Sequence, residues 1–168
     1  MNNNLIITIG REYGTGGREI GQKLALRLGV PFYDRELITR AAKKTGFDEK
    51  LFEQLDKRAT NSFLYSLTMF GSVGLNGMSL TAPLSLAQSN IIRAMAEASS
   101  CVIVGRCADH VLRDFPNKFD FFSHGSIEDR VKRVQTCGDY VIEGKTPEAA
   151  LEKMDKQRST YYNYYTGK

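Results

Sequence analysis

The sequence of 168 residues has few of the side chains that build metal centres and disulfide frameworks. It contains two histidines, His110 and His124, and neither has a cysteine or carboxylate at the spacing typical of zinc ligands. Its three cysteines include no C-x-x-C pair, and their odd number argues against a set of disulfides. We therefore expect no zinc site, and we expect reduced thiols in a cytoplasmic protein.

Long apolar runs and dense basic blocks are also missing. No apolar stretch approaches the ~20 residues that a helix needs to span a bilayer, and the polar start Met1-Asn2-Asn3-Asn4 does not resemble a signal peptide. The net charge of +4 comes without a cluster of lysine and arginine, so an anionic small molecule accounts for it as well as nucleic acid does. We expect one domain over residues 1–168, with no membrane and no nucleic-acid partner.

A glycine-rich turn between a strand pattern and a helix pattern is the most informative segment. Apolar residues 5–9 lead into it, and an amphipathic pattern over 18–28 follows and ends at Gly29. Glycines allow a tight turn that brings successive N–H groups and the positive end of the helix dipole toward an anion. The residues expected to hold phosphate are Gly14, Thr15, Gly16, Gly17, Arg18 and Glu19.

This turn differs from the usual phosphate-binding loop at two positions. The usual motif reads G-x-x-x-x-G-K-[ST], with a lysine for the outer phosphates and a hydroxyl for Mg²⁺. Here Arg18 follows the last glycine, and Glu19 stands where the hydroxyl is expected. Arg18 keeps the charge and can contact phosphate with a bidentate fork. A structural turn is the alternative, and the strand before and helix after favour phosphate binding.

Strand and helix patterns alternate along the rest of the chain. In the first helix, Ile20, Leu24 and Leu28 are expected to face the core. The alternation predicts an α/β fold with a mostly parallel sheet. Four strand patterns are visible, and a fifth would have to lie beyond Lys168. Further strands are predicted at 30–33, 101–104 and 119–122, and further helices at 83–98, from 126 and from 146.

Residues 56–85 carry no clear periodicity. Apolar residues there alternate with serine, threonine and glycine, and the glycines interrupt any helical or strand spacing. We interpret this segment as a partly helical insertion, with a protein–protein surface, and hence an oligomer contact, as the alternative.

Charged residues follow the predicted strands at the ends where a parallel sheet binds its ligands. Asp34 and Arg35 follow the second strand, and Arg106 and Asp109 follow the third. These four residues are candidates for substrate binding. For each pair taken alone, a helix cap or a surface ion pair is the alternative.

Two predicted helices near the C-terminus carry further arginines. Arg130 and Arg133 are three residues apart and share a helix face, and Arg158 lies on an apolar stripe of the last helix. An arginine on such a stripe is directed at an anion, or else pairs with Asp155 one turn before it. The polar segment 138–146 between these helices has the composition of a lid.

These motifs together resemble the cytidylate-kinase-like proteins, relatives of the nucleoside monophosphate kinases. The segments that carry the resemblance are 7–21, 31–38, 102–106, 128–133 and the helix that contains Asp155, Arg158, Tyr161 and Tyr162. The resemblance implies a P-loop kinase-type three-layer sandwich, with a parallel sheet, helices on both faces and a short lid. The loop lysine of true cytidylate kinases is absent here.

The resemblance also implies roles for the candidate residues. Residues 14–18 would hold the donor phosphates, and Arg18, Arg130, Arg133 and Arg158 would act in catalysis. Arg130 and Arg133 would border the lid, and Arg158 would reach the transferring phosphoryl group. Asp34, Arg35, Arg106 and Asp109 would face the phosphate acceptor.

The activity implied by the resemblance is ATP-dependent phosphoryl transfer to a nucleoside monophosphate, CMP-like, with Mg²⁺. The expected partner is therefore a nucleotide or another small phosphate acceptor. Two alternatives stay open. Phe32-Tyr33-Asp34 is similar to a segment of shikimate-type enzymes, which favours a small alcohol as acceptor. The missing loop lysine favours a module that binds nucleotide without catalysis.

Overall fold

The computed structural model describes residues 3–35, 81–138, 140 and 146–168, with the side chains of 81–85 and 87 left aside. In chain order the elements are β1 (Ile6–Arg11), α1 (Gly17–Leu28), β2 (Phe32–Tyr33), α5 (Thr81–Ala98), β3 (Cys101–Val104), α6 (Ala108–Val111), β4 (Lys118–Ser123), α7 (Ile127–Thr136) and α8 (Pro147–Thr166). The strands predicted from apolar, β-branched runs are all present, within one or two residues of the predicted bounds.

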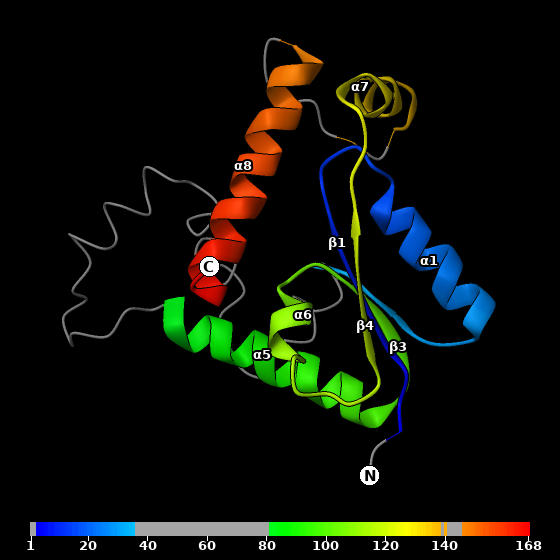
Figure 1. Ribbon diagram of the computed structural model, residues 1–168, viewed down its shortest axis with the longest axis vertical. Helices are drawn as coiled ribbons and strands as arrows, with labels where there is room; N and C mark the ends of the chain where they lie inside the picture. The colour runs from blue at the N-terminus through cyan, green and yellow to red at the C-terminus, as the bar shows by residue number, and fades with distance from the viewer. Residues whose placement is uncertain (1–2, 36–80, 139, 141–145) are drawn as a thin grey trace, which may run out of the picture.

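The four strands form one parallel sheet in the order β2-β3-β1-β4 (Figure 1). Ile7 of β1 is in register with Val102 of β3 on one side and with Phe119 of β4 on the other. Since all strands run the same way, their carboxyl ends share one edge of the sheet. That edge carries Arg11, Asp34 and the turn that starts at Gly105.

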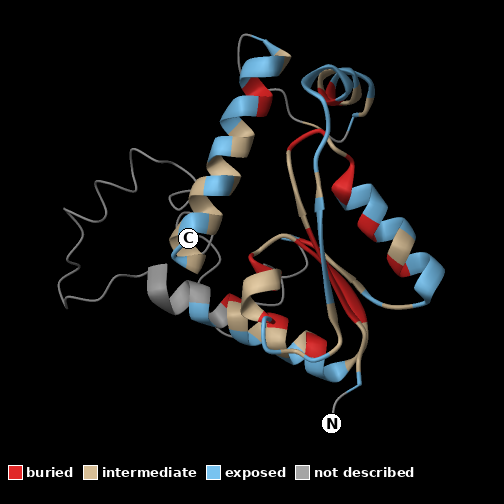
Figure 2. Ribbon diagram, viewed as in Figure 1, coloured by how far each residue is buried: buried red, intermediate tan, exposed pale blue. Residues whose placement is uncertain are grey.

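Helices cover both faces of the sheet, so that the fold has three layers. On one face, Ile7, Ile9, Val102 and Val104 pack with Ala25 of α1. On the other face, residues of the same strands pack against α5 and α6; this second cluster comprises Ile6, Cys101, Ile103, Ile92, Ala96, Ala108 and Leu112. The buried residues therefore concentrate along the central strands (Figure 2). The predicted α/β architecture with a parallel sheet and helices on both faces is confirmed.

The face that α1 turns to the sheet differs from the predicted one. Ile20 and Leu28 are exposed, and the buried residues of the helix are Gly17, Gly21 and Ala25. A Cβ atom on Gly21 would lie 2.7 Å from Val104 Cγ2, so the helix approaches the sheet more closely than large side chains allow. The prediction that Ile20 and Leu28 face the core is wrong, whereas Leu24 does pack on this core.

Two predicted segments lie wholly or largely outside the described residues. Of the lid at 138–146, only Gly138, Tyr140 and Thr146 are described, and of the insertion at 56–85 only 81–85, as the first turns of α5. Among the helices that are described, none has the length and apolar character needed to cross a membrane.

Candidate functional site

The glycine loop joins β1 to α1 at the carboxyl edge of the sheet. Gly14 and Gly16 have φ angles of +82° and +74°, values that favour glycine, and Gly16 is the N-cap of α1 without a capping side chain. The N–H groups of the first helical turn, from Gly17 to Glu19, have no acceptor within the helix because they open it. Thr15 Oγ1 donates to the Glu12 carbonyl within the loop, 2.9 Å away. The backbone thus has the form of an anion-binding turn.

Arg130 of α7 fastens one side of this loop. Its guanidinium contacts Glu12 Oε2 and Asp155 Oδ2, each at 2.8 Å, and its side chain is buried. A Cβ on Gly14 would lie 3.0 Å from the Arg130 carbonyl oxygen, so α7 packs directly on the loop backbone. Arg130 therefore links the loop, α7 and α8 through two carboxylates. Its predicted part in catalysis stays a prediction.

Arg133, one turn further along α7, covers the loop at Gly16. Its guanidinium pairs with the Glu19 carboxylate, and its Nε donates to Tyr140 Oη at 3.3 Å. A Cβ on Gly16 would lie 2.8 Å from the guanidinium carbon. Hydrogen bonds and charge from Lys23 and then from Arg133 lower the pKa of Glu19. A phosphate that enters the loop would compete with Glu19 for Arg133.

Arg18, the predicted replacement of the loop lysine, turns toward the end of β2. Its Nε donates to Asp34 Oδ2 at 2.8 Å, and its side chain is 49% exposed while that of Asp34 is 6% exposed. The two predicted site residues are thus brought together as an ion pair. The roles of Arg18 in catalysis and of Asp34 in substrate binding stay predictions.

Arg158 of α8 reaches the opposite side of the loop. Its Nη1 donates to the Arg11 carbonyl at 3.1 Å, and its guanidinium lies 5.1 Å from the centre of the Tyr13 ring. Burial is the largest cause that lowers the pKa of Arg158, and the positive charge of Arg35 lowers it further. The negative charge of Asp155 acts in the opposite direction. Asp155 itself binds Arg130 and accepts from the Tyr13 amide, at 2.6 Å, rather than pairing closely with Arg158. The last helix therefore presents a guanidinium to the site.

Sequence reasoning missed Arg11, the last residue of β1. Its guanidinium lies against Gly105, and burial together with the charge of Arg158 lowers its pKa to about 10. The available signal was its place at the end of the first strand, the same criterion that selected Asp34 and Arg106.

The turn after β3 holds three successive residues in the left-handed region. Gly105, Arg106 and Cys107 have φ angles of +80°, +59° and +52°, and such strain in non-glycine residues concentrates at functional sites. Arg106 Nη1 donates to Tyr161 Oη at 3.0 Å and lies over the same ring. The turn therefore presents the Arg106 side chain toward α8.

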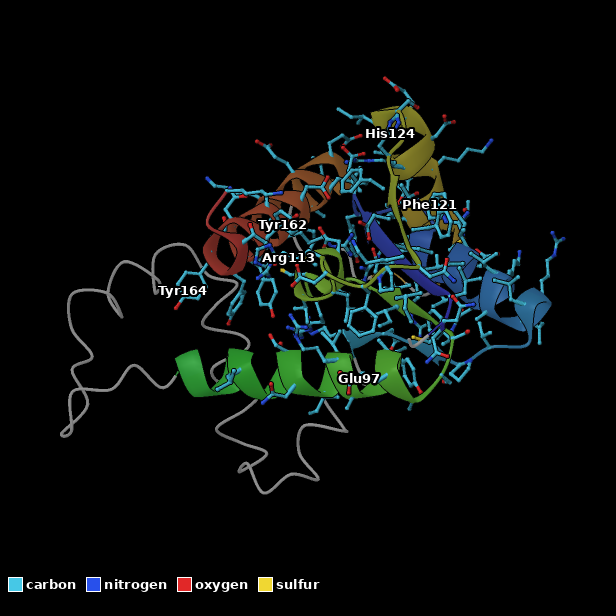
Figure 3. The ribbon with its side chains drawn as sticks, turned by 60° about the horizontal axis from the view of Figure 1, so that its bottom comes forward. Glu97, Arg113, Phe121, His124, Tyr162 and Tyr164 are labelled. Carbon is cyan, nitrogen blue, oxygen red and sulfur yellow. The ribbon has the colours of Figure 1, made fainter. Side chains whose placement is uncertain are left out.

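A second contact docks α8 on α6 beside this turn. The side chain of Tyr162 is labelled in Figure 3. Its Oη donates to Asp109 Oδ2 at 2.6 Å, and this hydrogen bond, with burial, raises the pKa of Tyr162 to about 12. Asp109 is thus engaged with α8, and its predicted contact with the phosphate acceptor stays a prediction.

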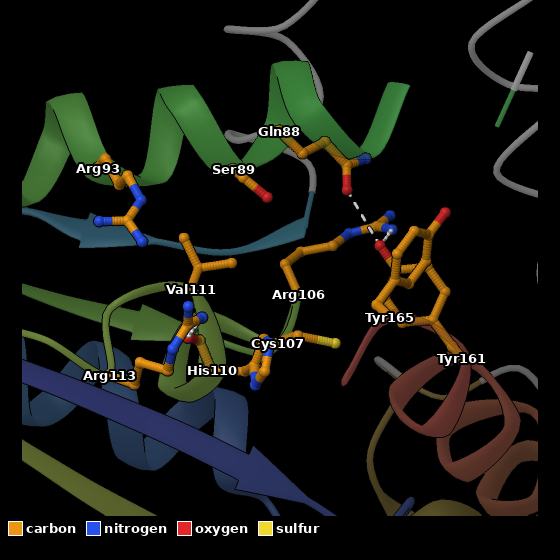
Figure 4. A pocket seen from close by; sticks show the side chains of 10 residues that line it. All are labelled: Gln88, Ser89, Arg93, Arg106, Cys107, His110, Val111, Arg113, Tyr161 and Tyr165. Atoms are coloured by element: carbon orange, nitrogen blue, oxygen red, sulfur yellow. Dashed lines mark hydrogen bonds between the residues drawn. The ribbon is translucent and has the colours of Figure 1, made fainter. Parts of the chain in front are cut away.

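A cavity of about 190 Å³ lies between α5, α6 and α8 (Figure 4). Its lining includes three arginines, one histidine and two tyrosines but no carboxylate; the ten residues are Gln88, Ser89, Arg93, Arg106, Cys107, His110, Val111, Arg113, Tyr161 and Tyr165. Such a lining favours an anionic group. Arg106 belongs both to this cavity and to the surroundings of Arg11, because its charge contributes to the lowered pKa of Arg11.

A magnesium ion would find few ligands of its own among the described residues. No group of three metal-ligating side chains occurs in the described part of the chain. Glu19, which the sequence predicts at the position of the usual hydroxyl, is engaged by Lys23 and Arg133. Mg²⁺ at a kinase site is bound largely by substrate phosphates and water, and we derive no step from side-chain coordination of this ion.

The chain belongs to the cytidylate kinase-like family, whose model matches residues 6–168. The resemblance seen in the sequence motifs is thereby confirmed, and with it a kinase-like, nucleotide-binding fold. No curated protein matches the chain.

Three of the solved structures that are similar to this chain are the following. An uncharacterized protein from Eubacterium ventriosum ATCC 27560 is 30% identical, with a TM-score of 0.67 over 98% of this chain and 81% of that one. Shikimate kinase from Bacteroides thetaiotaomicron is 16% identical, with a TM-score of 0.49 over 94% and 81%. Shikimate kinase from Acinetobacter baumannii in complex with shikimate is 13% identical, with a TM-score of 0.45 over 97% and 80%.

Proposed function

We propose that this protein transfers a phosphoryl group from ATP to a nucleoside monophosphate, with a CMP-like acceptor by family resemblance. One observation carries the proposal beyond family membership. Arg11, Arg106 and Arg158 come from β1, the turn after β3 and α8. Arg158 Nη1 donates to the Arg11 carbonyl at 3.1 Å, and the Arg11 guanidinium lies against Gly105, the residue before Arg106. Such a group of cations beside a glycine loop suits a ligand with several negative charges.

The donor phosphates would lie against the N–H groups of residues 14–18. Phosphoryl transfer requires mainly that two substrates are positioned in line and that charge on the transferring group is neutralised. Arg158 supports this role because its guanidinium is held by a carbonyl oxygen and a ring rather than by a close carboxylate. Arg133 would join once the phosphates displace Glu19.

The acceptor phosphate would lie on the side of Arg106, in or beside the cavity that also contains Arg93 and Arg113. This places the acceptor across Arg106 from the glycine loop. Asp34 is the candidate for orienting the acceptor, since its carboxylate lies at the end of β2 on the same edge. No general base is required for this chemistry in our proposal.

A coupled assay of ADP release tests the proposal. The protein is incubated with ATP, Mg²⁺ and each of a panel of nucleoside monophosphates and small alcohols, including CMP and shikimate. We expect acceptor-dependent ADP release with a nucleoside monophosphate, and a loss of that release in Arg106→Met. Release with small alcohols alone would favour the shikimate-type alternative, and ATP binding without release would favour the non-catalytic module.

A further inference from the structure

The Arg11 side chain occupies the space that a side chain at position 17 would need. A Cβ on Gly17 would lie 3.0 Å from Arg11 Cβ and 3.0 Å from Arg11 Cδ, closer than ordinary van der Waals contact. A side chain at residue 17 would therefore crowd the aliphatic stem of Arg11, which would have to shift by a few tenths of an ångström. Arg11 is the last residue of β1 and Gly17 the first of α1, so this contact lies where the phosphate-binding turn begins and ends.

The structure also shows which residue occupies the lysine position of the motif. Gly16 is the N-cap of α1, and the lysine of G-x-x-x-x-G-K-[ST] follows the last motif glycine at the helix start. If Gly16 is that glycine, the lysine position falls on Gly17 and the first glycine position on Arg11. The chain then has glycine where the motif has lysine, and a cation where the motif has glycine.

A second glycine makes room for the far end of Arg11. A Cβ on Gly105 would lie 2.7 Å from Arg11 Nη1, and Gly105 has a φ angle of +80°. The Arg11 side chain thus extends from the end of β1, past the start of α1, to the turn after β3. Gly17 borders the aliphatic stem and Gly105 borders the guanidinium, so the stem lies beside the start of α1 and the guanidinium beside the turn after β3.

The charge of this guanidinium is not compensated by a close partner. Within the described part of the chain, no hydrogen bond or ion pair engages it. Arg158 and Arg106 add positive charge around it, and Asp34, the carboxylate whose charge acts on it, is bonded to Arg18. Burial lowers the pKa of Arg11 to about 10. A half-buried cation among cations costs folding free energy, and an anion placed there would offset that cost.

Arg18 offers a direct comparison. It carries the same charge and follows the same loop, but its guanidinium pairs with Asp34 and its side chain is half exposed. To meet phosphate in the loop, Arg18 would have to break its ion pair with a buried carboxylate. The Arg11 guanidinium has no such ion pair to break among the residues that the structure describes.

We infer that Arg11, and not Arg18, contacts the nucleotide phosphates in place of the missing loop lysine, its side chain reaching them through the space that Gly17 leaves open. The inference rests on the proposed function only in taking the phosphates to lie at the glycine loop. Arg11 is then a phosphate-binding residue of the loop.

The test measures binding of ATP, and separately of inorganic tripolyphosphate, by calorimetry with the intact chain. Arg11→Met keeps most of the stem and removes the charge, and Arg18→Met is the matched control. Loss of a charge-assisted hydrogen bond corresponds to roughly tenfold weaker binding or more, so we expect that loss for Arg11→Met and less than about threefold for Arg18→Met. Thermal unfolding gives a second readout, since removing an uncompensated cation should leave the unfolding temperature of Arg11→Met unchanged or raise it.

A rescue variant tests whether side chains at positions 11 and 17 compete for the same space. Arg11→Ala with Gly17→Lys places the motif lysine in the vacated space and should bind ATP more tightly than Arg11→Ala alone. Gly17→Lys in the presence of Arg11 should instead lower stability. Unchanged binding of both probes in Arg11→Met, or a larger loss in Arg18→Met, would overturn the inference.

The outcomes separate this inference from the proposed function. If the chain binds ATP through Arg11 but releases no ADP with any acceptor, phosphoryl transfer fails and the inference stands. If the chain binds tripolyphosphate and not ATP, the inference is tested with tripolyphosphate alone. It then requires a larger loss of tripolyphosphate binding in Arg11→Met than in Arg18→Met. Failure to bind either probe would contradict both.

Discussion

On the α7 side of the glycine loop, Arg130 is bonded to the carboxylates of Glu12 and Asp155. On the β3 side, Arg158 donates to a carbonyl oxygen and lies over the Tyr13 ring, and Arg11 has two further arginines around it. The same residue type thus serves two purposes within a short distance of one loop. Where carboxylates neutralise it, arginine links the loop to the helices. Where the described residues supply no such carboxylate, we propose that it meets a ligand's charge.

The largest effect that we expect from any of these substitutions is the loss of catalysis when Arg158 is replaced. Arg158→Met should cost about 2–4 kcal/mol of transition-state stabilisation, by analogy with the loss of one preorganised donor. The measurement is kcat/KM for the best acceptor in the ADP-release assay, with urea unfolding to show that the variant is folded. Normal turnover in a folded Arg158→Met would exclude this arginine from the site.

Arg130→Met should instead act on stability. Its removal leaves Glu12 and Asp155 without the cation between them, and breaking such a buried pair costs about 3 kcal/mol of unfolding free energy. The urea midpoint should fall accordingly, while turnover per folded molecule stays within a few-fold of the wild type. A stable Arg130→Met with abolished turnover would reverse the two sides of the comparison.

Two glycine substitutions probe how rigidly each part of the loop is covered. Gly14→Ala and Gly16→Ala share the strain of a positive φ angle, about 1–2 kcal/mol. A methyl group on Gly14 also meets the Arg130 backbone and Val134, whereas one on Gly16 meets the movable end of Arg133. Gly14→Ala should therefore be less stable than Gly16→Ala by about 1 kcal/mol in unfolding free energy. Equal losses would mean that Arg133 is held as firmly as the helix backbone.

Which of these features the sequence could predict depends on how local their causes are. The strands, the glycine turn and the α/β order follow from short patterns in neighbouring residues. The buried face of α1 does not, because Gly21 is buried by a close approach to Val104 and Phe32, which lie elsewhere in the chain.

The residues of the candidate site likewise differ in whether a local sequence pattern could predict them. Arg158 and Arg106 could be selected from their positions on a helix stripe and after a strand. Arg130 and Arg133 share a predicted face, yet their different partners depend on where α8 and α1 pack. Arg11 was missed because its environment is set by Gly17 and Gly105, and no pattern in residues 11–18 contains the second of these.

A smaller effect concerns the acid that holds Arg133 over the loop. Glu19→Gln removes the partner of Arg133 and a negative charge at the mouth of an anion-binding turn. ATP binding should become about threefold tighter, as expected for an exposed ion pair, and the gain should shrink at high salt. Lys23→Met, which removes the other partner of Glu19, is the control and should give no such gain. Weaker binding in Glu19→Gln would show that Glu19 itself supports the ligand.

The smallest effect is the pH dependence of the Glu12–Arg130 contact. Burial raises the pKa of Glu12, but the hydrogen bonds from Arg130 and the Gly125 amide and the Arg130 charge outweigh it, and the net pKa is lowered. Because the folded pKa lies below the unfolded value of about 4.3, the contribution is complete above that pH and is lost as the pH falls through the folded pKa. The stability difference between wild type and Glu12→Gln, measured by urea unfolding from pH 7 to pH 3, should therefore shrink in acid. A constant difference would refute the linkage.

A crystal structure of the protein with a non-hydrolysable ATP analogue tests the central claim most directly. The account predicts phosphates against the N–H groups of residues 14–18, with the guanidinium groups of Arg11 and Arg158 within hydrogen-bonding distance and Arg130 still bonded to Glu12 and Asp155. Phosphates bound elsewhere, with Arg133 still closed over Gly16 and Arg11 remote from them, would contradict it.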